Sequence, residues 1–204
     1  MTGLLSRAGF DARFEEILVG VRRGAGKAAL LAIDLDGFKA INDDHGHAAG
    51  DEVIREIGAR LHDSIRLTDA AVRRGGDEFG VLLAGVSDAA AADVLADRIW
   101  QRLREPIETE KGVVEVGASI GGVLADHSSK FLVVDKLHAL ADHEMYLVKE
   151  RRDGGGVGWW SPRRPAVPRT STASDGSVAD KRGESYGGVP VPRGPVPEPG
   201  DGQS

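Results

Sequence analysis

Short apolar runs of strand length alternate along the chain with apolar residues spaced three or four positions apart. The run at 30–33 and the runs on either side of 73–79 are typical of buried strands. Apolar residues at helical spacing predict four amphipathic helices, over 10–21, 53–65, 94–103 and 137–148. A short helical turn is also expected after the first strand. This order predicts an α/β (α+β) fold in which a mostly antiparallel central sheet is surrounded by helices.

A charged hairpin tip is predicted between two of these strands. Gly75 and Gly76 provide the positive φ angles that a tight turn needs. Asp77 and Glu78 then start the returning strand as two adjacent carboxylates, which repel each other unless a cation lies beside them. Taken alone, this tip is explained equally well by a solvated turn and by a cation site.

A second acidic pair ends the first predicted strand and favours the cation site. Because side chains alternate along a strand, Asp34 and Asp36 are expected on the same side, away from Ile33 and Leu35. Carboxylates gathered in this way suit hard divalent cations. The residues that follow offer backbone N–H groups and one ammonium to a phosphate where a helix begins: Gly37, Phe38 and Lys39.

Two further segments are expected from turn residues. A second hairpin is predicted over 108–125, with its turn at Lys111 and Gly112 and its return strand from 114 to 119. A loop is expected at 45–51, in which His45 and His47 either bind a metal or order the loop. We favour the ordering role, because the oxygen ligands nearby suit magnesium instead.

Composition limits the classes of protein to which the chain can belong. With 204 residues, 41% of them hydrophobic and 28% charged, it is suited to one globular core. A formal net charge of −6 argues against nucleic-acid and anionic-membrane binding, and the lack of cysteine excludes disulfides and thiolate sites. No apolar stretch is long enough to span a membrane, so a cytoplasmic protein is expected.

The composition changes abruptly after Trp160. Eight of the 9 prolines lie between Pro162 and Pro199, among frequent Gly and Ser and few aliphatic residues. Such a segment cannot bury enough apolar surface to offset its chain entropy. We therefore expect a folded domain over 1–160 and a disordered Pro/Gly/Ser-rich tail over 161–204, with a linker or protein-docking role for the tail as the alternative.

The motifs resemble, in order and in spacing, those of the GGDEF family of diguanylate cyclases. The matching stretches are Asp-Leu-Asp-Gly-Phe-Lys at 34–39, Ile-Asn-Asp at 41–43, Gly-His-Ala-Ala-Gly-Asp at 46–51 and Arg-Arg-Gly-Gly-Asp-Glu-Phe at 73–79. The resemblance covers about three quarters of the chain, from Thr2 to Lys149. It implies the ferredoxin-like palm of nucleotidyl cyclases and the condensation of two GTP molecules into cyclic di-GMP and two pyrophosphates.

The resemblance also implies roles for individual residues. Those that would hold two magnesium ions in each half-site, with manganese as the alternative, are Asp34, Leu35 through its carbonyl, Asp77 and Glu78. Those that would bind GTP are Gly37, Phe38, Lys39, Asn42, Asp51 and Lys149, the last at the γ-phosphate. The amide of Asn42 and the carboxylate of Asp51 complement the acceptor and donors of the guanine edge. The base is Asp77 or the metal-bound oxygen network around it, and Arg73 has an orienting role.

An Arg-x-x-Asp pattern precedes the predicted hairpin. Alone, Arg66 and Asp69 are typical of a surface ion pair. At this distance from the signature they match the family's inhibitory product site, in which the arginine contacts guanine and phosphate and the aspartate a guanine edge. The resemblance therefore implies feedback inhibition by cyclic di-GMP.

The match departs from the family after Lys149. Where the family has Lys-x-x-Gly-Arg-Asn, Asp153 replaces the arginine that helps to hold the terminal phosphate, and Arg152 lies one position earlier. This departure favours one alternative, a catalytically silent module that binds GTP or cyclic di-GMP and acts through a protein partner. A second alternative, an ATP-using cyclase, is disfavoured by Asn42 and Asp51.

The resemblance implies that two copies of the domain act together. Each subunit of a homodimer would hold one GTP, because one half-site cannot complete the ring. Family members usually continue upstream into a sensor or signalling helix, whereas Met1 here almost adjoins the first motif. Either a stand-alone domain or a truncated start is expected, with an upstream sensor or regulatory protein as a candidate partner.

Overall fold

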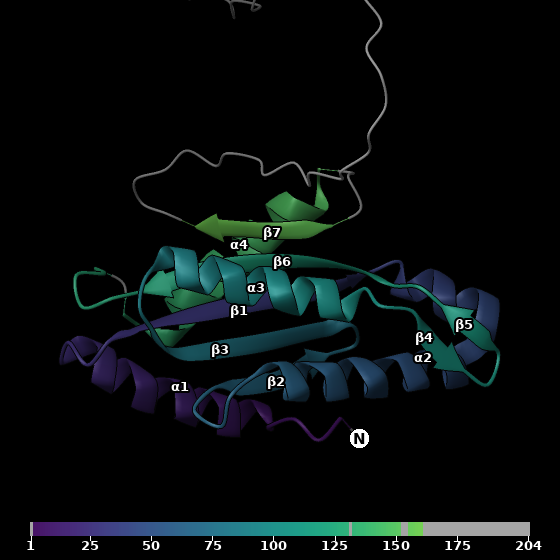
Figure 1. Ribbon diagram of the computed structural model, residues 1–204, viewed down its shortest axis with the longest axis horizontal. Helices are drawn as coiled ribbons and strands as arrows, with labels where there is room; N and C mark the ends of the chain where they lie inside the picture. The colour runs from purple at the N-terminus through teal and green to yellow at the C-terminus, as the bar shows by residue number, and fades with distance from the viewer. Residues whose placement is uncertain (1, 131, 152–154, 161–204) are drawn as a thin grey trace, which may run out of the picture. The chain divides into compact units, whose positions relative to one another are not determined.

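A five-stranded sheet with the order β2-β3-β1-β6-β7 lies at the centre of the fold (Figure 1). The computed structural model describes residues 2–130, 132–151 and 155–160, so the expected tail lies outside the described residues. The strands of this sheet are β1 (Lys27–Asp36), β2 (Ala70–Gly75), β3 (Glu78–Val86), β6 (Gly117–Ala125) and β7 (Gly156–Trp160). The helices are α1 (Arg7–Arg22), α2 (Phe38–Ser64), α3 (Ala89–Leu103) and α4 (Val134–Lys149). Among the strands in the described part of the chain, β6 and β7 alone pair in parallel, which confirms the predicted mostly antiparallel sheet.

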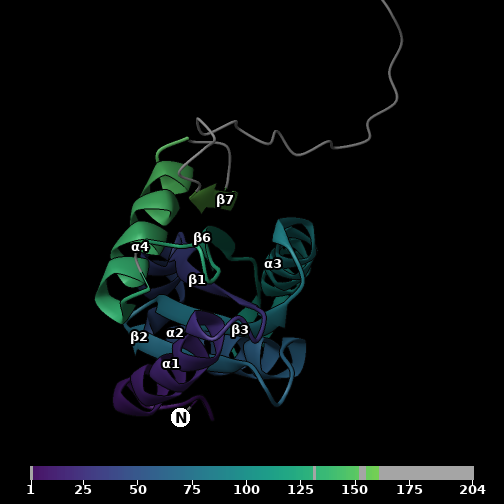
Figure 2. The ribbon, with the colours of Figure 1, turned by 90° about the vertical axis from the view of Figure 1, so that its left-hand side faces the viewer.

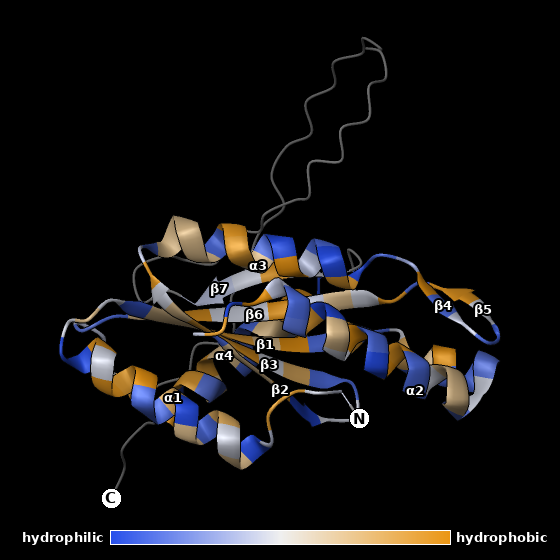
Figure 3. Ribbon diagram, turned by 60° about the horizontal axis from the view of Figure 1, so that its bottom comes forward, coloured by the Kyte–Doolittle hydropathy of each residue, from blue (hydrophilic) through white to orange (hydrophobic). Residues whose placement is uncertain are grey.

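Helices cover both faces of the sheet, and each face has its own apolar layer. Because β1 is buried along nearly its whole length, its alternating side chains enter opposite layers. Ile33 belongs to the layer packed with α2 and α3, whereas Leu30 and Ala32 belong to the layer packed with α1 and α4. Figure 2 shows α3 and α4 on opposite sides of the strands, and Figure 3 shows the strongly apolar colouring of the strands between them.

The loop expected at 45–51 is helical instead. α2 runs through this segment with a break at Gly46, whose φ of 83° and ψ of 161° lie outside the helical region. Glycine adopts this φ at no steric cost, so the helix can resume on the other side of the break. His45 and His47 therefore flank a break within a helix and do not order a loop. Among the described residues, neither α2 nor any other helix is long and apolar enough to cross a membrane.

The first predicted hairpin is confirmed, and the second is wrong in its return strand. Gly75 and Gly76 turn the chain between β2 and β3 with φ of 147° and 52°. Downstream, β4 (Ile107–Thr109) and β5 (Gly112–Val114) form a separate two-stranded sheet that turns at the predicted place. The chain then leaves this small sheet, and β6 pairs with β1 in the main sheet. β6 is nearly all buried, which suits a central strand with helices on both faces better than a surface hairpin.

The apolar pattern does not predict β7. This strand pairs in parallel with β6, from Ser119 opposite Gly156 to Val123 opposite Trp160. Trp159 Nε1 donates a hydrogen bond of 3.0 Å to Asp93 Oδ1 on α3. The glycines and tryptophans of β7 show no alternation of polar and apolar residues, so the strand is recognised only through its contacts with β6, α3 and α4.

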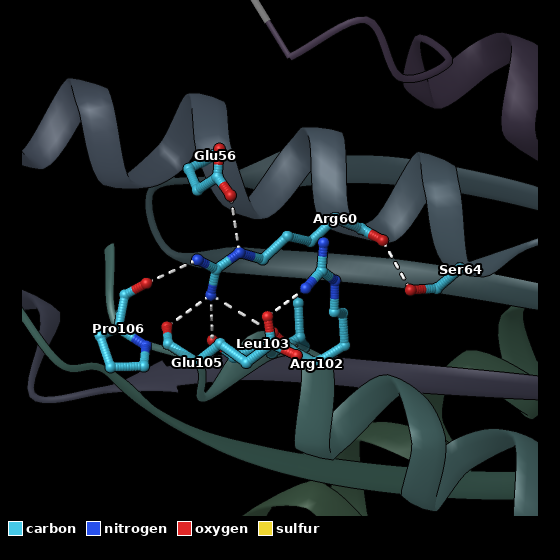
Figure 4. Close-up of polar contacts among 7 residues, drawn as sticks. All are labelled: Glu56, Arg60, Ser64, Arg102, Leu103, Glu105 and Pro106. Atoms are coloured by element: carbon cyan, nitrogen blue, oxygen red, sulfur yellow. Dashed lines mark hydrogen bonds and ion pairs between the residues drawn. The ribbon is translucent and has the colours of Figure 1, made fainter. Parts of the chain in front are cut away.

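A buried arginine joins α2 to the end of α3 (Figure 4). Arg60 is 5% exposed, and its Nε donates a hydrogen bond of 2.7 Å to Glu56 Oε1. Its terminal nitrogens donate to backbone carbonyls at the end of α3 and just beyond it, in Arg102, Leu103, Glu105 and Pro106. The guanidinium thus supplies donors to carbonyls that a helix end leaves unpaired, and its charge complements the helix dipole.

We expect Arg60→Leu to lower the free energy of unfolding by about 1.5–3 kcal/mol, the range for hydrogen bonds to a charged group. The loss follows because buried carbonyls at the end of α3 lose their donor. Denaturant unfolding measures it, with Arg55→Leu at an exposed position of α2 as the matched control. Equal losses in the two variants would show that the Arg60 contacts do not stabilise the fold.

Candidate active site

One end of the sheet carries acidic side chains from two neighbouring strands. β1 and β3 pair so that Asp34 lies directly opposite Glu78. By alternation, Asp34 and Asp36 lie on the same side of β1 as Leu30 and Ala32, which is the side covered by α1 and α4. Glu78 opens on this side too, into a hollow lined by residues of α1 and α4. Like charges directly opposite each other destabilise a sheet, so this acidic end favours a cation.

Lys149 places a cation there from the last turn of α4. Its Nζ donates a hydrogen bond of 2.5 Å to Asp34 Oδ1. Burial lowers the pKa of Lys149, but the hydrogen bond to Asp34 and the charges of Asp34, Asp36 and Asp77 outweigh burial and raise the pKa above its ordinary value. The charges of all three carboxylates therefore reach the same ammonium group.

Asp36 is held by a serine of the neighbouring strand. Ser119 Oγ lies 3.0 Å from each carboxylate oxygen of Asp36. Burial raises the pKa of Asp36, and the charge of Asp34 raises it further, while the Ser119 hydrogen bond and the charge of Lys149 act in the opposite direction. Asp36 is thus a fixed part of the acidic end, tied to β6.

Hydrogen bonds fix the hairpin tip beside these acids. Leu35 N donates to Asp77 O at 3.2 Å, which extends the contact between β1 and the hairpin beyond β3 itself. Arg73 Nε and Nη2 donate to Gly76 O at 3.0 and 2.8 Å. Asp77 is half-buried and Glu78 is exposed, so the tip keeps Glu78 open to solvent on a fixed backbone.

The donor chemistry of the acidic end fits a hard divalent cation. Carboxylates and a backbone carbonyl are oxygen ligands, and the ammonium of Lys149 already pairs with Asp34. Within the described residues, no three His, Cys, Asp or Glu side chains gather closely enough to hold a metal by themselves. Magnesium usually takes only one or two carboxylates from a protein and completes its coordination with phosphates and water. The carboxylates of the acidic end are enough for magnesium bound in this way.

α2 begins directly after β1 with an N-terminus that no side chain caps. Its N-cap residue is Gly37, with φ of 78°, and no side-chain hydrogen bond is made there. Lys39 is exposed in the first turn. Free N–H groups and the positive end of the helix dipole make this terminus suitable for an anionic group.

Asn42 packs closely against Gly50, the residue before Asp51. A Cβ at Gly50 would lie 2.0 Å from Asn42 Oδ1 and 3.3 Å from the tip of the Phe38 ring. Only glycine therefore allows Asn42 to pack across the break at Gly46. Asn42 is half-buried, and Asp51, the neighbour of Gly50, is exposed. The amide predicted to bind guanine thus packs against the residue next to the predicted carboxylate.

The Arg-x-x-Asp segment forms a turn in which the aspartate is already bonded. Asp69 Oδ2 accepts a hydrogen bond of 2.9 Å from Arg66 N, and Oδ1 accepts one of 2.9 Å from Ala84 N on β3. Arg66 is exposed and lines a hollow together with Arg98 and Arg102 of α3. Asp69 therefore has a structural role that its sequence pattern does not predict, while the side chain of Arg66 faces a basic surface.

Comparison with known families matches this arrangement of motifs. Residues 1–154 match the family described as diguanylate cyclase, GGDEF domain. The chain belongs to the GGDEF family. This match confirms the resemblance to the family that the signature residues indicate.

Curated relatives of this GGDEF domain include diguanylate cyclases from two bacteria. Diguanylate cyclase TpbB of Pseudomonas aeruginosa is 38% identical over 156 residues, which cover 76% of this chain and 35% of TpbB. Diguanylate cyclase DgcS of Shewanella oneidensis is 33% identical over 149 residues, which cover 73% of this chain and 48% of DgcS. The chain thus spans less than half the length of either relative.

Solved structures support the fold of the GGDEF domain. The GGDEF domain of TpbB (YfiN) from Pseudomonas aeruginosa is 36% identical with a TM-score of 0.72, covering 79% of this chain and 99% of that one. Diguanylate cyclase SiaD of the same species, solved in complex with its activator SiaC, is 26% identical with a TM-score of 0.70, covering 78% of this chain and 60% of that one.

The structure gathers most of the predicted site residues of this GGDEF domain around one end of the sheet. Arg66 and Asp69 do not join them and lie at the turn before β2. Lys149, expected at a phosphate, pairs with Asp34. The sequence pattern identifies Ser119 only as part of a core strand, because its bond to Asp36 joins residues 83 positions apart. Asp153 and Arg152 lie outside the described residues.

We expect Asp34→Asn to lower the pKa of Lys149, because it removes the hydrogen bond and the charge that raise it. The pair stabilises the fold fully below about 10.5, the pKa of an unpaired lysine. This stabilisation is lost as the pH rises through the raised pKa of the folded protein. NMR titration of the Lys149 side chain measures the shift, with Asp63→Asn on the exposed face of α2 as the control. A Lys149 pKa that is the same in both variants would contradict the pairing.

Proposed function

We propose that this GGDEF domain condenses two GTP molecules into cyclic di-GMP and two pyrophosphates. The observation that carries the proposal is that opposed carboxylates and an uncapped helix start meet at one end of the sheet, while Asn42, in that helix, packs against the neighbour of Asp51. These features suit, in turn, divalent cations, phosphates and guanine. The curated relatives named diguanylate cyclase support the same reaction.

The acidic end is the proposed metal site. Two magnesium ions, with manganese as the alternative, would be held by Asp34, the Leu35 carbonyl, Asp77 and Glu78. Metals bound in this way lower the pKa of an attacking hydroxyl and neutralise charge on phosphates. Since Lys149 pairs with Asp34 in the protein described here, we propose that it turns to the γ-phosphate when GTP binds.

The nucleotide is placed by residues of α2. The phosphates would lie at its N-terminus, against Gly37, Phe38 and Lys39. The guanine edge would bind Asn42 and Asp51, whose amide and carboxylate match its O6 acceptor and its N–H donors. Adenine presents a donor in place of O6 and lacks these N–H groups, so an ATP-using cyclase is disfavoured.

The reaction forms two phosphodiester bonds between the same two nucleotides. In each step the 3′-hydroxyl oxygen of one GTP bonds to the α-phosphorus of the other. The bond from that phosphorus to the bridging oxygen breaks, and pyrophosphate leaves with the electron pair. The hydroxyl proton passes to Asp77 or to the oxygen network around it. Because one domain holds one GTP, the reaction needs two domains that face each other as a homodimer.

A protein partner is proposed to control this dimer. SiaD, which has the same fold, is solved in complex with an activator protein. An upstream sensor or a separate regulatory protein would act in the same way here by bringing two domains together. Because its proposed substrate is GTP, we propose that this domain acts in the cytoplasm.

Asp153 favours a second candidate, a silent module that binds GTP or cyclic di-GMP and acts through a partner. The family arginine replaced by Asp153 contributes a charge-assisted contact to the terminal phosphate, of a kind worth about 1.5–3 kcal/mol. Its loss weakens GTP binding without removing the carboxylates that carry the chemistry. The intact acidic end therefore favours the cyclase over the silent module.

Detection of cyclic di-GMP by mass after incubation with GTP and Mg²⁺ tests the cyclase. We expect product from the wild-type protein and about a hundredfold less from Asp77→Ala and from Glu78→Ala, because the metals supply several kcal/mol of transition-state stabilisation. Asp63→Ala, on the exposed face of α2, is the matched control and should leave the rate unchanged. Bound GTP without product at high protein concentration would contradict the cyclase and support the silent module, with Asp153→Arg as the first reversion to make.

Arg66 and Asp69 are proposed to bind the product as an inhibitor. Arg66→Ala should raise the inhibition constant for cyclic di-GMP about tenfold or more, the scale of a lost charge-assisted contact. This variant keeps the turn, because the bond to Asp69 uses only the backbone of Arg66. Arg55→Ala, on the exposed face of α2, is the control. Unchanged inhibition in the double variant Arg66→Ala/Asp69→Asn would rule out a feedback site at this turn.

A further inference from the structure

Arg74 occupies an irregular position at the end of β2, next to the signature turn. Arg73 pairs with Phe79, and Gly75 pairs with Glu78, so the register shifts between them and Arg74 is the extra residue. An extra residue of this kind locally disrupts the ladder and re-aims its side chain. The side chain of Arg74 reaches α4, on the same face of the sheet as Asp34.

The partner of Arg74 on α4 is Asp142. Arg74 Nη1 and Nη2 each bond a different oxygen of the Asp142 carboxylate, the second at 3.0 Å. A guanidinium held by two parallel bonds is fixed in direction as well as in position. Both side chains are largely covered, with 25% of Arg74 and 36% of Asp142 exposed.

The charge of Glu78 acts on the same guanidinium. Arg74, Glu78 and Asp142 line one hollow of about 390 Å³ between α1, α4 and the hairpin. The pKa of Arg74 is raised first by its hydrogen bond to Asp142, against the effect of burial, and then by the charges of Asp142, Glu78 and Asp11. Asp11 is turned toward His138, at 3.7 Å, whereas Glu78 starts the strand paired with the residue next to Arg74.

We propose that Asp142 is a positioning residue that holds the Arg74 guanidinium on α4 and so keeps the Glu78 carboxylate available to a divalent cation. Without Asp142, Arg74 would turn to Glu78, the acid on the adjacent strand, and compete with the metal. Asp142 is not among the proposed metal or nucleotide ligands and would act through Arg74. The inference rests on the proposed function, because it takes Glu78 as a metal ligand.

Competition between Arg74 and the metal predicts that variants of Arg74 and of Asp142 differ in metal binding. An ion pair that only stabilises the fold does not predict this difference. If the ion pair only tied the hairpin to α4, Arg74→Gln would weaken metal binding as much as Asp142→Asn, because each leaves one charge of the pair without its partner. If Asp142 restrains a competing cation, Asp142→Asn should harm metal binding, whereas Arg74→Gln should not. The double variant should then regain what Asp142→Asn loses. Arg74→Lys keeps the charge but cannot make two parallel hydrogen bonds to Asp142. Its metal binding should therefore resemble that of Asp142→Asn.

Mn²⁺-dependent binding of a fluorescent, non-hydrolysable GTP analogue tests this without turnover. Formation of the metal–nucleotide complex in solution is the same for every variant, so differences between variants belong to the protein. We expect Asp142→Asn and Arg74→Lys to raise the half-saturating Mn²⁺ concentration roughly two- to fivefold, the scale of one partly exposed ion pair. Arg74→Gln and Arg74→Gln/Asp142→Asn should bind at least as well as wild type. Glu105→Gln, which removes the acid from the exposed Arg102–Glu105 pair, is the matched control.

Each outcome decides between the alternatives. Wild-type binding in Asp142→Asn, or a double variant as weak as Asp142→Asn, would overturn the role of Asp142 and leave the cyclase proposal standing. If the wild-type protein itself shows no Mn²⁺-dependent binding, both the role of Asp142 and the cyclase proposal would be overturned. If Asp142→Asn does not fold, the contrast between Arg74→Lys and Arg74→Gln gives the same decision, and equal binding by these two variants would refute the competition.

Discussion

The candidate site depends on the register in which β1 pairs with β3. That register sets Asp34 opposite Glu78 and lets Leu35 N bond the backbone of Asp77 at the hairpin tip. A slip of one residue would turn the acids of β1 into the apolar layer under α2 and α3 and expose Ile33 on the other face. Because aliphatic side chains fill both layers, the core itself holds the acids at the end of the sheet.

Two basic side chains from other elements lie near the charges at this end. Lys149, in the last turn of α4, pairs with Asp34 and also complements the negative end of its own helix. Arg74 lies beside Glu78 but is held by Asp142. Lys149 thus pairs with one carboxylate of the acidic end, and a divalent cation would neutralise charge that remains.

The sequence predicts how residues close together in the chain are arranged. It does not predict contacts between residues that are far apart in the chain. Alternation along β1 correctly placed Asp34 and Asp36 together, and Gly75 and Gly76 marked the turn. The bond from Lys149 to Asp34 spans 115 positions, and the pair of Arg74 and Asp142 spans 68, so no local pattern contains them. β7 was missed because its glycine-rich sequence lacks the alternation that reveals a strand. The strand at β6 was expected, but as the return strand of a hairpin, and the break at Gly46 hid a helix inside a polar segment.

The proposed function requires the acidic end of the sheet to bind the metal ions and phosphates of GTP. A crystal structure with Mn²⁺ and a non-hydrolysable GTP analogue, with manganese located by anomalous diffraction, would show whether it does. We expect manganese within bonding distance of the Asp34 and Asp77 oxygens, with Lys149 turned from Asp34 to the terminal phosphate. Nucleotide bound with no manganese at these carboxylates, and with Lys149 still paired with Asp34, would contradict it.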